Sequence, residues 1–489
     1  MTRNHLHLIW PGLVLLICRG LSSVVLPIYD DAFITLRYAR NLASGIGFVY
    51  QRNEWILGTT SPGFGLLNSL FFLLRLPMPS STVVANVVAD LVILYLTLYV
   101  LRRAHCVLAA SVFAILFSVS PILNRICVGG MEANWFLALS LMSVLLYIRS
   151  RKLPAFALAA LAYLFRPEAL ILLGVLLVVE WFREKSVPFR YGILSVSMLA
   201  AFWVVLYFLY GRVVPQSVIA KSHLHKPSPF SVLESLLLVP DPIIVAAVPL
   251  SVLGFVRHYR ESFFVKIIGV WCATYAGLYL LARPQVWSWY GEAIYYSLCV
   301  LSGLAIGRFA DVFAAARAVN SRLVRVVTYA VTLAPICIWA VIGIVHGPSK
   351  VTQRIYKPVA EWCRQNTNES TSILAYDIGV IGYYSNSHIC DLAGLVWPEA
   401  SKFASTRALI QKCSPDYLFL TATRQDISLM LDPELADAYR PIARFSQEGA
   451  SDLRPRPDGL PAHWTQNYIL YQRVRPLQHL TRKPQFVTP

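Results

Sequence analysis

The sequence predicts a polytopic α-helical membrane protein with a small α/β domain at its C-terminal end. Hydrophobic residues make up 56% of the 489 residues and charged residues only 14%, and the mean hydropathy is +0.56. This composition is too apolar for a soluble enzyme of such a length. Apolar runs alternate with short basic clusters up to residue 346, after which the composition becomes polar. We therefore expect a transmembrane domain at 1–346 and a second domain at 347–489.

Basic residues give the chain a formal net charge of +17, and they are dispersed between the apolar runs. This pattern is typical of cytoplasmic loops under the positive-inside rule, and it argues against nucleic-acid binding. Arg3, His5 and His7 precede the first run, 8–27, which lacks a convincing cleavage site and is expected to be retained as a span. A cytoplasmic start places the first loop, 29–61, outside.

Alternating sides through the later basic clusters predicts about eleven crossings, with the C-terminal domain outside. One stretch conflicts with this count. If both apolar runs between 62 and 101 crossed fully, the basic pair Arg102–Arg103 would lie outside. We therefore expect the shorter run, 62–76, to be re-entrant or incomplete.

Two adjacent carboxylates, Asp30 and Asp31, follow the first span directly. Neighbouring like charges repel, and a nearby bilayer strengthens the repulsion. The pair therefore suits a site where a cation, a proton or a metal balances its negative charge. Residues 31–44 are predicted to form a short helix along the membrane surface. Its polar face carries Arg37, Arg40, Asn41 and Ser44. The same pattern also suits a capped interfacial helix without any chemistry, and spacing alone leaves both interpretations open.

The first outer loop ends in a turn-rich segment, 58–63, which contains Thr60. Its hydroxyls and backbone amides suit an anion held near the two carboxylates. A turn that only restarts a helix at Pro62 needs no ligand, so this alternative stays open as well.

The other loops predicted to lie outside carry many ionisable and aromatic residues. They include Arg125, Glu132, Arg166, Glu168, Gln216, Lys221, His223, Arg283, Trp287, Trp289, Tyr290 and Glu292. Ionisable groups at membrane depth are costly, so a group of them on one side is a hypothesis for a functional site. Snorkelling to the interface explains any single Arg or Lys equally well, and the aromatic residues also fit an interfacial belt.

The polar C-terminal part has the pattern of an α/β domain. We expect a helix at 357–364 and strands at 372–376, 388–390 and 417–421. The GxGxxG spacing of a dinucleotide site is lacking, so no nucleotide is expected. From about Glu448 the chain is rich in Pro and Arg and is predicted to be less ordered.

Cys363, Cys390 and Cys413 fall in this polar part. Because their number is odd, they allow at most one bridge with one thiol left over.

Several of these stretches together resemble the polyprenyl-phosphate-dependent glycosyltransferases of the GT-C type. The closest resemblance is to the bacterial group that includes the mycobacterial terminal arabinofuranosyltransferase. The matching stretches, which follow the family's order, are 30–41, 58–62, 130–133, 166–168, 214–221, 289–290, 377–384 and 391–395. Protein O-mannosyltransferases and the lipid A aminoarabinose transferase are similar more remotely. This chain departs from the family at Ala133, where Thr is usual, and at Gln216–Ser217, where Asn-Thr is usual; the second departure bears on specificity.

The resemblance implies an inverting glycosyltransferase in the inner (plasma) membrane, with its active site and C-terminal domain on the extracytoplasmic side. It would transfer a sugar, arabinofuranose in the closest group, from a polyprenyl phosphate to a hydroxyl of a glycan. The alternative within this class is a mannosyl- or aminoarabinosyl-type transferase acting on protein or lipid. A transporter or lipid flippase is the alternative from another class, but it should show internal repeats and ionisable residues near mid-span.

The resemblance also implies roles for the polar residues. Asp30 would be the general base, and Asp31 would help it, by orienting the acceptor or by binding a divalent metal such as Mg²⁺ or Mn²⁺ with Asp30. The donor phosphate would be bound by Arg166, Arg283, Lys221, Arg125 and His223. Glu132 and Glu168 would hold these cations or a metal in place. Further candidates for substrate binding are Arg37, Thr60, Trp289 and Tyr290.

Overall fold

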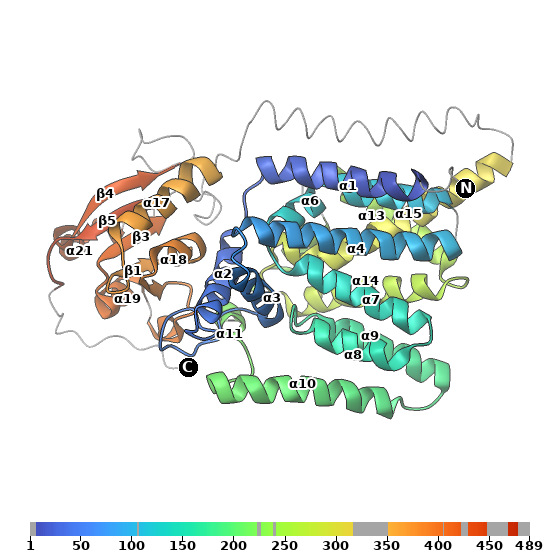
Figure 1. Cartoon of the computed structure of the whole chain (residues 1–489), viewed down its shortest axis with the longest axis horizontal. Coiled ribbons are helices and arrows are strands. Elements are labelled where there is room, and N and C mark those ends of the chain that lie inside the picture. Colours follow the sequence, from blue (N-terminus) through green and yellow to red (C-terminus); the bar gives the residue numbers. More distant parts are fainter. Residues whose placement is uncertain are drawn as a thin grey trace.

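The protein consists of a helical bundle and a sheet domain that packs against one end of it (Figure 1). The computed structural model describes residues 6–104, 107–222, 226–237, 241–315, 351–403, 405–421, 429–446 and 468–477. The predicted boundary at 346/347 lies outside these residues. Four short elements of the helical part lie at the end that faces the sheet domain, and three of them contribute residues to the site described below.

Most helices of the bundle lie side by side along the long axis of the molecule (Figure 1). The helices of the bundle are α1 (Leu6–Val25), α4 (Ser80–Ala104), α5 (Val107–Val119), α6 (Pro121–Val128), α7 (Ala133–Ile148), α8 (Lys152–Ala162), α9 (Ala169–Glu184), α10 (Phe189–Tyr210), α12 (Pro229–Leu237), α13 (Pro242–His258), α14 (Phe263–Ala282) and α15 (Glu292–Ala315). The short elements at the end of the bundle are α2 (Asp30–Ala43), α3 (Pro62–Leu73), α11 (Gln216–Ser222) and η1 (Ser288–Gly291).

Helix α2 confirms the predicted short helix after the first span. Its axis is bent by 96° from that of α1, as expected for a helix that lies across the end of the bundle. Helix α3 has 12 residues and is therefore about 18 Å long. This length is well short of a hydrocarbon core of about 30 Å, in agreement with the prediction that the run at 62–76 does not cross fully.

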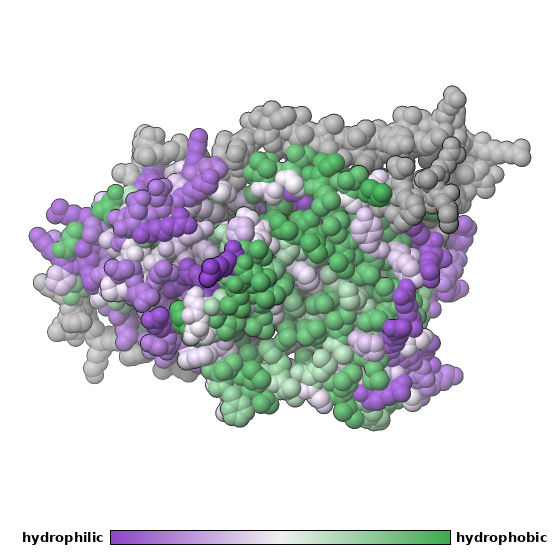
Figure 2. Space-filling model, viewed as in Figure 1, coloured by the Kyte–Doolittle hydropathy of each residue, from purple (hydrophilic) through white to green (hydrophobic). Residues whose placement is uncertain are grey.

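The surface of the bundle is that of a membrane protein. Figure 2 shows a broad hydrophobic face over the helices, with hydrophilic residues on the sheet domain and at the opposite end. Among the described residues, three helices are long and apolar enough to cross a membrane, or up to five if each bent helix pair is one span. The last part of the predicted transmembrane domain, 316–346, lies outside the described residues, and the total of about eleven crossings stays a prediction.

The C-terminal part holds a five-stranded sheet. Its strands are β1 (Ser372–Ala375), β2 (His388–Asp391), β3 (Tyr417–Thr421), β4 (Tyr439–Phe445) and β5 (Tyr468–Arg473), in the order β2-β1-β3-β5-β4. The first three pair in parallel, and β5 is antiparallel to both of its neighbours. Its helical elements are η2 (Thr352–Tyr356), α17 (Lys357–Asn366), α18 (Gly379–Ser385), η3 (Pro398–Lys402), α19 (Thr406–Cys413) and α21 (Pro433–Ala438). The predicted helix and three strands are confirmed.

Strand β5 corrects, for residues 468–473, the expectation that the chain is less ordered from about Glu448; residues 447–467 and 478–489 lie outside the described residues. It lies inside the sheet between β3 and β4, and four of its residues, 468–471, are buried. Aromatic and β-branched residues favour such a half-buried pleated surface, a local signal that the Pro- and Arg-rich flanks obscured. Cys390 and Cys413 form a disulfide, and Cys363 is free and buried, which agrees with one bridge and one remaining thiol.

A charged pair that the sequence analysis did not single out lies inside the bundle. Arg19 of α1 donates from Nε to Asp90 of α4 at 2.7 Å, and both side chains are at most 1% exposed. Asn134 of α7 donates to the second oxygen of Asp90, also at 2.7 Å. Three helices are thus joined by one buried carboxylate.

Removing one partner of the Arg19–Asp90 pair should lower the free energy of unfolding more than removing both partners. Asp90→Leu leaves Arg19 buried without its counter-charge and should lower the free energy of unfolding by about 3–5 kcal/mol. The double variant with Arg19→Met removes both charges and should recover most of that loss. Thermal unfolding of the purified protein in detergent measures both changes. A double variant as unstable as Asp90→Leu would show that the unpaired charge is not the cause.

Candidate active site

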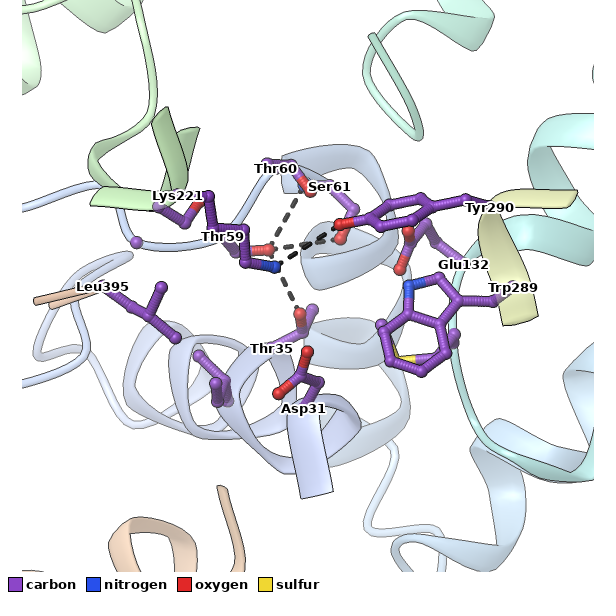
Figure 3. A pocket seen from close by; sticks show the side chains of 14 residues that line it. Asp31, Thr35, Thr59, Thr60, Ser61, Glu132, Lys221, Trp289, Tyr290 and Leu395 are labelled. Carbon is purple, nitrogen blue, oxygen red and sulfur yellow. Dashed lines mark hydrogen bonds between the residues drawn. The ribbon is translucent and has the colours of Figure 1, made fainter. Parts of the chain in front are cut away.

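A pocket opens at the end of the bundle that faces the sheet domain, and its lining comes from both parts of the chain (Figure 3). The space inside it, including its open mouth, is about 430 Å³. Its polar lining residues are Asp31, Thr35, Thr59, Thr60, Ser61, Glu132, Ser217, Lys221, Trp289 and Tyr290. The sheet domain contributes Leu395.

A carboxylate and an ammonium group lie in the same pocket. Asp31 enters it from the first turn of α2, and Lys221 enters it from α11 on another side (Figure 3). The Lys221 ammonium donates to the Tyr290 hydroxyl at 3.4 Å. Burial lowers the pKa of Lys221, but the neighbouring Tyr290 and Asp31 outweigh this effect, and its pKa lies above the usual value. Lys221 is therefore a cation at physiological pH.

Three hydroxyl groups form a row along one wall. Thr35 and Thr59 are hydrogen-bonded through their side-chain oxygens at 3.1 Å, and Thr59 bonds Ser61 in the same way at 3.1 Å. Thr35 lies one helical turn after Asp31 on α2, so both side chains reach the same side. Such a wall offers donors and acceptors to a polyol or an anion.

The wall that carries Tyr290 is supported by an ionic network. Arg166 lies over the Tyr290 ring, 4.5 Å from its centroid. Its guanidinium donates to Glu132 at 2.8 Å and to Glu168 at 2.6 Å. The Tyr279 hydroxyl donates to Glu168 at 2.5 Å. Because two carboxylates already bind Arg166, which is 2% exposed, we infer that it shapes the pocket and does not contact a ligand.

Asp30 is directed to the sheet domain and does not line the pocket. One carboxylate oxygen accepts the backbone N–H of Gly379 at 2.7 Å, and the other accepts that of Val380 at 2.8 Å. Burial raises the pKa of Asp30 to about 8, and repulsion from Asp377 adds to the shift. A raised pKa alone does not make a base, because a base also needs an oxygen within reach of the proton that it takes. The predicted assignment of Asp30 as the base does not fit this geometry.

Arg37 is likewise part of the junction between the two domains. It is buried and donates to the carbonyl groups of Gly382 and Ser387, each at 2.8 Å. This corrects its place among the substrate-binding candidates. The other three candidates of that group, Thr60, Trp289 and Tyr290, do line the pocket.

The described cations among the five predicted to bind a phosphate do not converge on one place. Of the four that the structure describes, only Lys221 lines the pocket. Arg283 is exposed just after α14, and Arg125 is exposed beside the Tyr29 ring, 5.7 Å from its centroid. His223 lies outside the described residues. The positions of these residues in loops predicted to lie outside suggested that they bind together. In the structure the described side chains point in different directions.

The two adjacent carboxylates do not form a chelating pair, because both oxygens of Asp30 are engaged by the sheet domain. Among the described residues, no group of three or more His, Cys, Asp or Glu side chains is arranged to hold a metal ion. A divalent metal stays a prediction, and no step below depends on it.

Some pocket residues had not been singled out from the sequence, namely Thr35, Met131 and Leu395. Thr59 and Ser61 belong to the turn 58–63, whose hydroxyls were expected to suit an anion, and Ser217 belongs to the departure that bears on specificity. The spacing of four residues between Asp31 and Thr35 was an available signal. The sequence around Leu395 does not indicate that it lines a pocket, because its position depends on how the sheet domain docks.

The whole arrangement is similar to solved structures of membrane proteins. ArnT from Cupriavidus metallidurans in the apo state superposes with a TM-score of 0.62 at 9% identity, over 96% of this chain and 98% of that one. The structure of the same protein bound to undecaprenyl phosphate gives 0.60 at 11% identity, over 96% and 98%. The chain has the GT-C fold.

A second protein shares this fold. The oligosaccharyltransferase of Archaeoglobus fulgidus in the apo form gives a TM-score of 0.56 at 13% identity, over 94% of this chain and 75% of that one. Residues 349–471 match a family described as a domain of unknown function, DUF8728. No curated protein matches the sequence. The expected fold is thus confirmed, whereas the resemblance to the arabinofuranosyltransferase group stays a prediction.

Arg166 and Arg283, two of the three arginines predicted to bind the phosphate, should differ sharply in their effect on stability. Arg166→Gln leaves Glu132 and Glu168 without a counter-charge, so the free energy of unfolding should fall by about 3–5 kcal/mol. Arg283→Gln changes an exposed side chain and should stay within about 0.5 kcal/mol of the parent. Thermal unfolding in one detergent compares the two. Equal losses would contradict the supporting role of Arg166.

Proposed function

We propose that this protein is a membrane glycosyltransferase that transfers a sugar from a polyprenyl phosphate to a hydroxyl group of an acceptor. The observation that carries the proposal is the pocket in which Asp31 and Lys221 lie on different walls of a space lined with hydroxyl groups. The GT-C fold supports it, because ArnT has been solved with undecaprenyl phosphate and the archaeal oligosaccharyltransferase AglB with dolichol phosphate.

Asp31 is the general base of this mechanism. As the acceptor oxygen attacks the anomeric carbon, its proton passes to the Asp31 carboxylate, and a new C–O bond forms. A positioned base of this kind contributes about 10²- to 10⁴-fold. Attack from the face opposite the phosphate inverts the configuration of the sugar.

Lys221 acts on the leaving group. The bond between the anomeric carbon and the phosphate oxygen breaks, and the phosphate keeps the electron pair. The ammonium group of Lys221 stabilises this growing negative charge, as a preorganised cation does in a partly dehydrated site. The row of Thr35, Thr59 and Ser61 hydrogen-bonds the sugar, while Trp289 and Tyr290 present ring faces to it.

The finer parts of the proposal are the donor sugar, the acceptor and the side of the membrane. Similarity to the arabinofuranosyltransferase group favours arabinofuranose as the sugar and an extracytoplasmic glycan as the acceptor; a mannosyl- or aminoarabinosyl-type transfer to protein or lipid is the alternative. We place the site on the outer side of the inner (plasma) membrane. The Cys390–Cys413 disulfide supports this side, because such bonds persist in oxidising compartments.

Purified protein assayed with a panel of polyprenyl-phosphate sugars and hydroxyl acceptors tests the function. Asp31→Asn keeps the shape of the side chain but removes the base, so turnover should fall by at least about 10²-fold. Binding of undecaprenyl phosphate should persist in this variant. Glu369→Gln, the same chemical change at a side chain that is 71% exposed, is the control. Full turnover by Asp31→Asn would exclude it as the base.

The role of Lys221 is tested by binding alone. Lys221→Met keeps the length of the side chain and removes its charge, so the affinity for undecaprenyl phosphate should fall by about tenfold or more, which is the worth of one charged hydrogen bond. Arg283→Met, at an exposed site, should leave the affinity unchanged. Binding measurements in nanodiscs compare the affinity of the parent protein, Lys221→Met and Arg283→Met for undecaprenyl phosphate. A loss with Arg283→Met but not with Lys221→Met would contradict this assignment.

A further inference from the structure

We propose that Asp30 is a positioning residue that fastens the sheet domain to α2 and thereby holds Asp31 and Leu395 at the pocket. The claim that Asp30 docks the sheet domain does not depend on which reaction the protein catalyses. The consequence for turnover rests on the function proposed above, in which Asp31 is the base.

Asp30 contacts the backbone of α18 directly, through both its carboxylate and its own backbone oxygen. Both carboxylate oxygens accept N–H groups, from Gly379 at 2.7 Å and from Val380 at 2.8 Å. A Cβ atom added to Gly379 would lie 1.8 Å from the backbone oxygen of Asp30 and 2.6 Å from its carboxylate. Only glycine allows α18 to come this close, so the sequence at 379 is set by the docking.

Other residues of the first loop reinforce this attachment. Arg37, two turns further along α2, donates to the carbonyl groups of Gly382 and Ser387. Its guanidinium also lies 4.2 Å from the centroid of the Tyr50 ring. The Tyr50 hydroxyl donates to the carbonyl of Ile378 at 2.6 Å, one residue before Gly379. The start and end of α18 are therefore both held by α2 and the loop after it.

The sheet domain also supplies a wall of the pocket through the loop after β2. Asp391 is fully buried and accepts the backbone N–H groups of Ala393 and Val396, each at 2.8 Å. These bonds fold the loop into a fixed turn. Leu395, which lies inside this turn, lines the pocket (Figure 3).

The loop after β2 packs tightly against the helical part of the chain. A Cβ atom on Gly58 would lie 2.5 Å from the Val396 side chain and 2.8 Å from the Leu395 carbonyl oxygen. Gln216 of α11 donates to the carbonyl of Gly394 at 3.1 Å, five residues before Lys221. The docked sheet domain thus touches both the loop that carries the hydroxyl row and the helix that carries Lys221.

Two adjacent carboxylates therefore have different partners. Successive residues of a helix are rotated by about 100°, so Asp30 and Asp31 cannot share one ligand without distortion. Asp30 binds the sheet domain, and Asp31 lines the pocket. Any movement of α18 acts on the residue next to the base, and a displacement of about 1 Å at a reacting group is enough to cost about 10²-fold in rate.

The test uses the full-length protein and three variants: Asp30→Asn, Gly379→Ala and the double variant. Asn offers only one acceptor oxygen to the two N–H groups, and its NH₂ group opposes the other. Hydrogen exchange of the Gly379 and Val380 amides should therefore become about tenfold faster in each variant. Turnover should fall by about 10²-fold through kcat, with little change in the KM for the donor.

Coupling between the two changes separates positioning from catalysis. Both changes disturb the same contact, so the double variant should lose no more turnover than the worse single variant. Glu369→Gln on the sheet domain and Gly277→Ala on α14, where nothing lies within 4 Å, are the matched controls and should change neither quantity. If Gly379→Ala does not fold, Asp30→Asn alone still decides the outcome.

Two results would overturn the proposal. Loss of turnover in Asp30→Asn without faster exchange at Gly379 and Val380 would make Asp30 catalytic. Faster exchange with unchanged kcat would show that docking does not position the base. If the parent protein transfers no sugar in any assay, the function proposed above is wrong, and the exchange measurement still decides whether Asp30 docks the domain.

Discussion

The contact between α2 and α18 is the interaction on which the rest of the site depends. In the proposed reaction, the donor is anchored in the bilayer by its lipid and keeps its reacting end at the membrane edge. The pocket is then completed there by groups from both the helical part and the sheet domain. In this protein the joint is made by a side-chain carboxylate on two backbone N–H groups nearly 350 positions away. Two hydrogen bonds, one to each oxygen of the Asp30 carboxyl group, hold it against α18 at two points, which suits a joint that must fix a position.

The elements that sequence analysis predicted correctly are those with a local signal. Helix α2 has a polar face at helical spacing, α3 is a short apolar run, and β1, β2 and β3 are short apolar runs between turns. Strand β5 was missed because its flanks dominate the composition of that stretch. The pair Arg19–Asp90 was missed for a related reason, since one charge barely alters the mean hydropathy of a long run, although its burial requires a partner.

For the site, the sequence identified many of the residues but not their directions. Asp31, Thr60, Glu132, Lys221, Trp289 and Tyr290 were all candidates, and all line the pocket. Which of two neighbouring carboxylates faces a ligand depends on helix phase and on a contact with a distant segment, and neither is visible in spacing. In the same way, spacing does not show that Glu132 and Glu168, the two carboxylates expected to hold the cations in place, both engage Arg166.

The charges left at the pocket explain why a mobile lysine suits this site. Glu132 and Glu168 are both ion-paired with Arg166. Of the charged residues that line the pocket in the described part of the chain, Asp31 and Lys221 are those for which the structure shows no ion pair. Lys221 is a compact charge on a flexible chain, whereas arginine presents a planar fork that fits one fixed geometry. In the proposed reaction, the phosphate oxygen moves and gains charge as it departs from the sugar. A lysine can follow that movement while the arginine network behind Tyr290 keeps the wall in place.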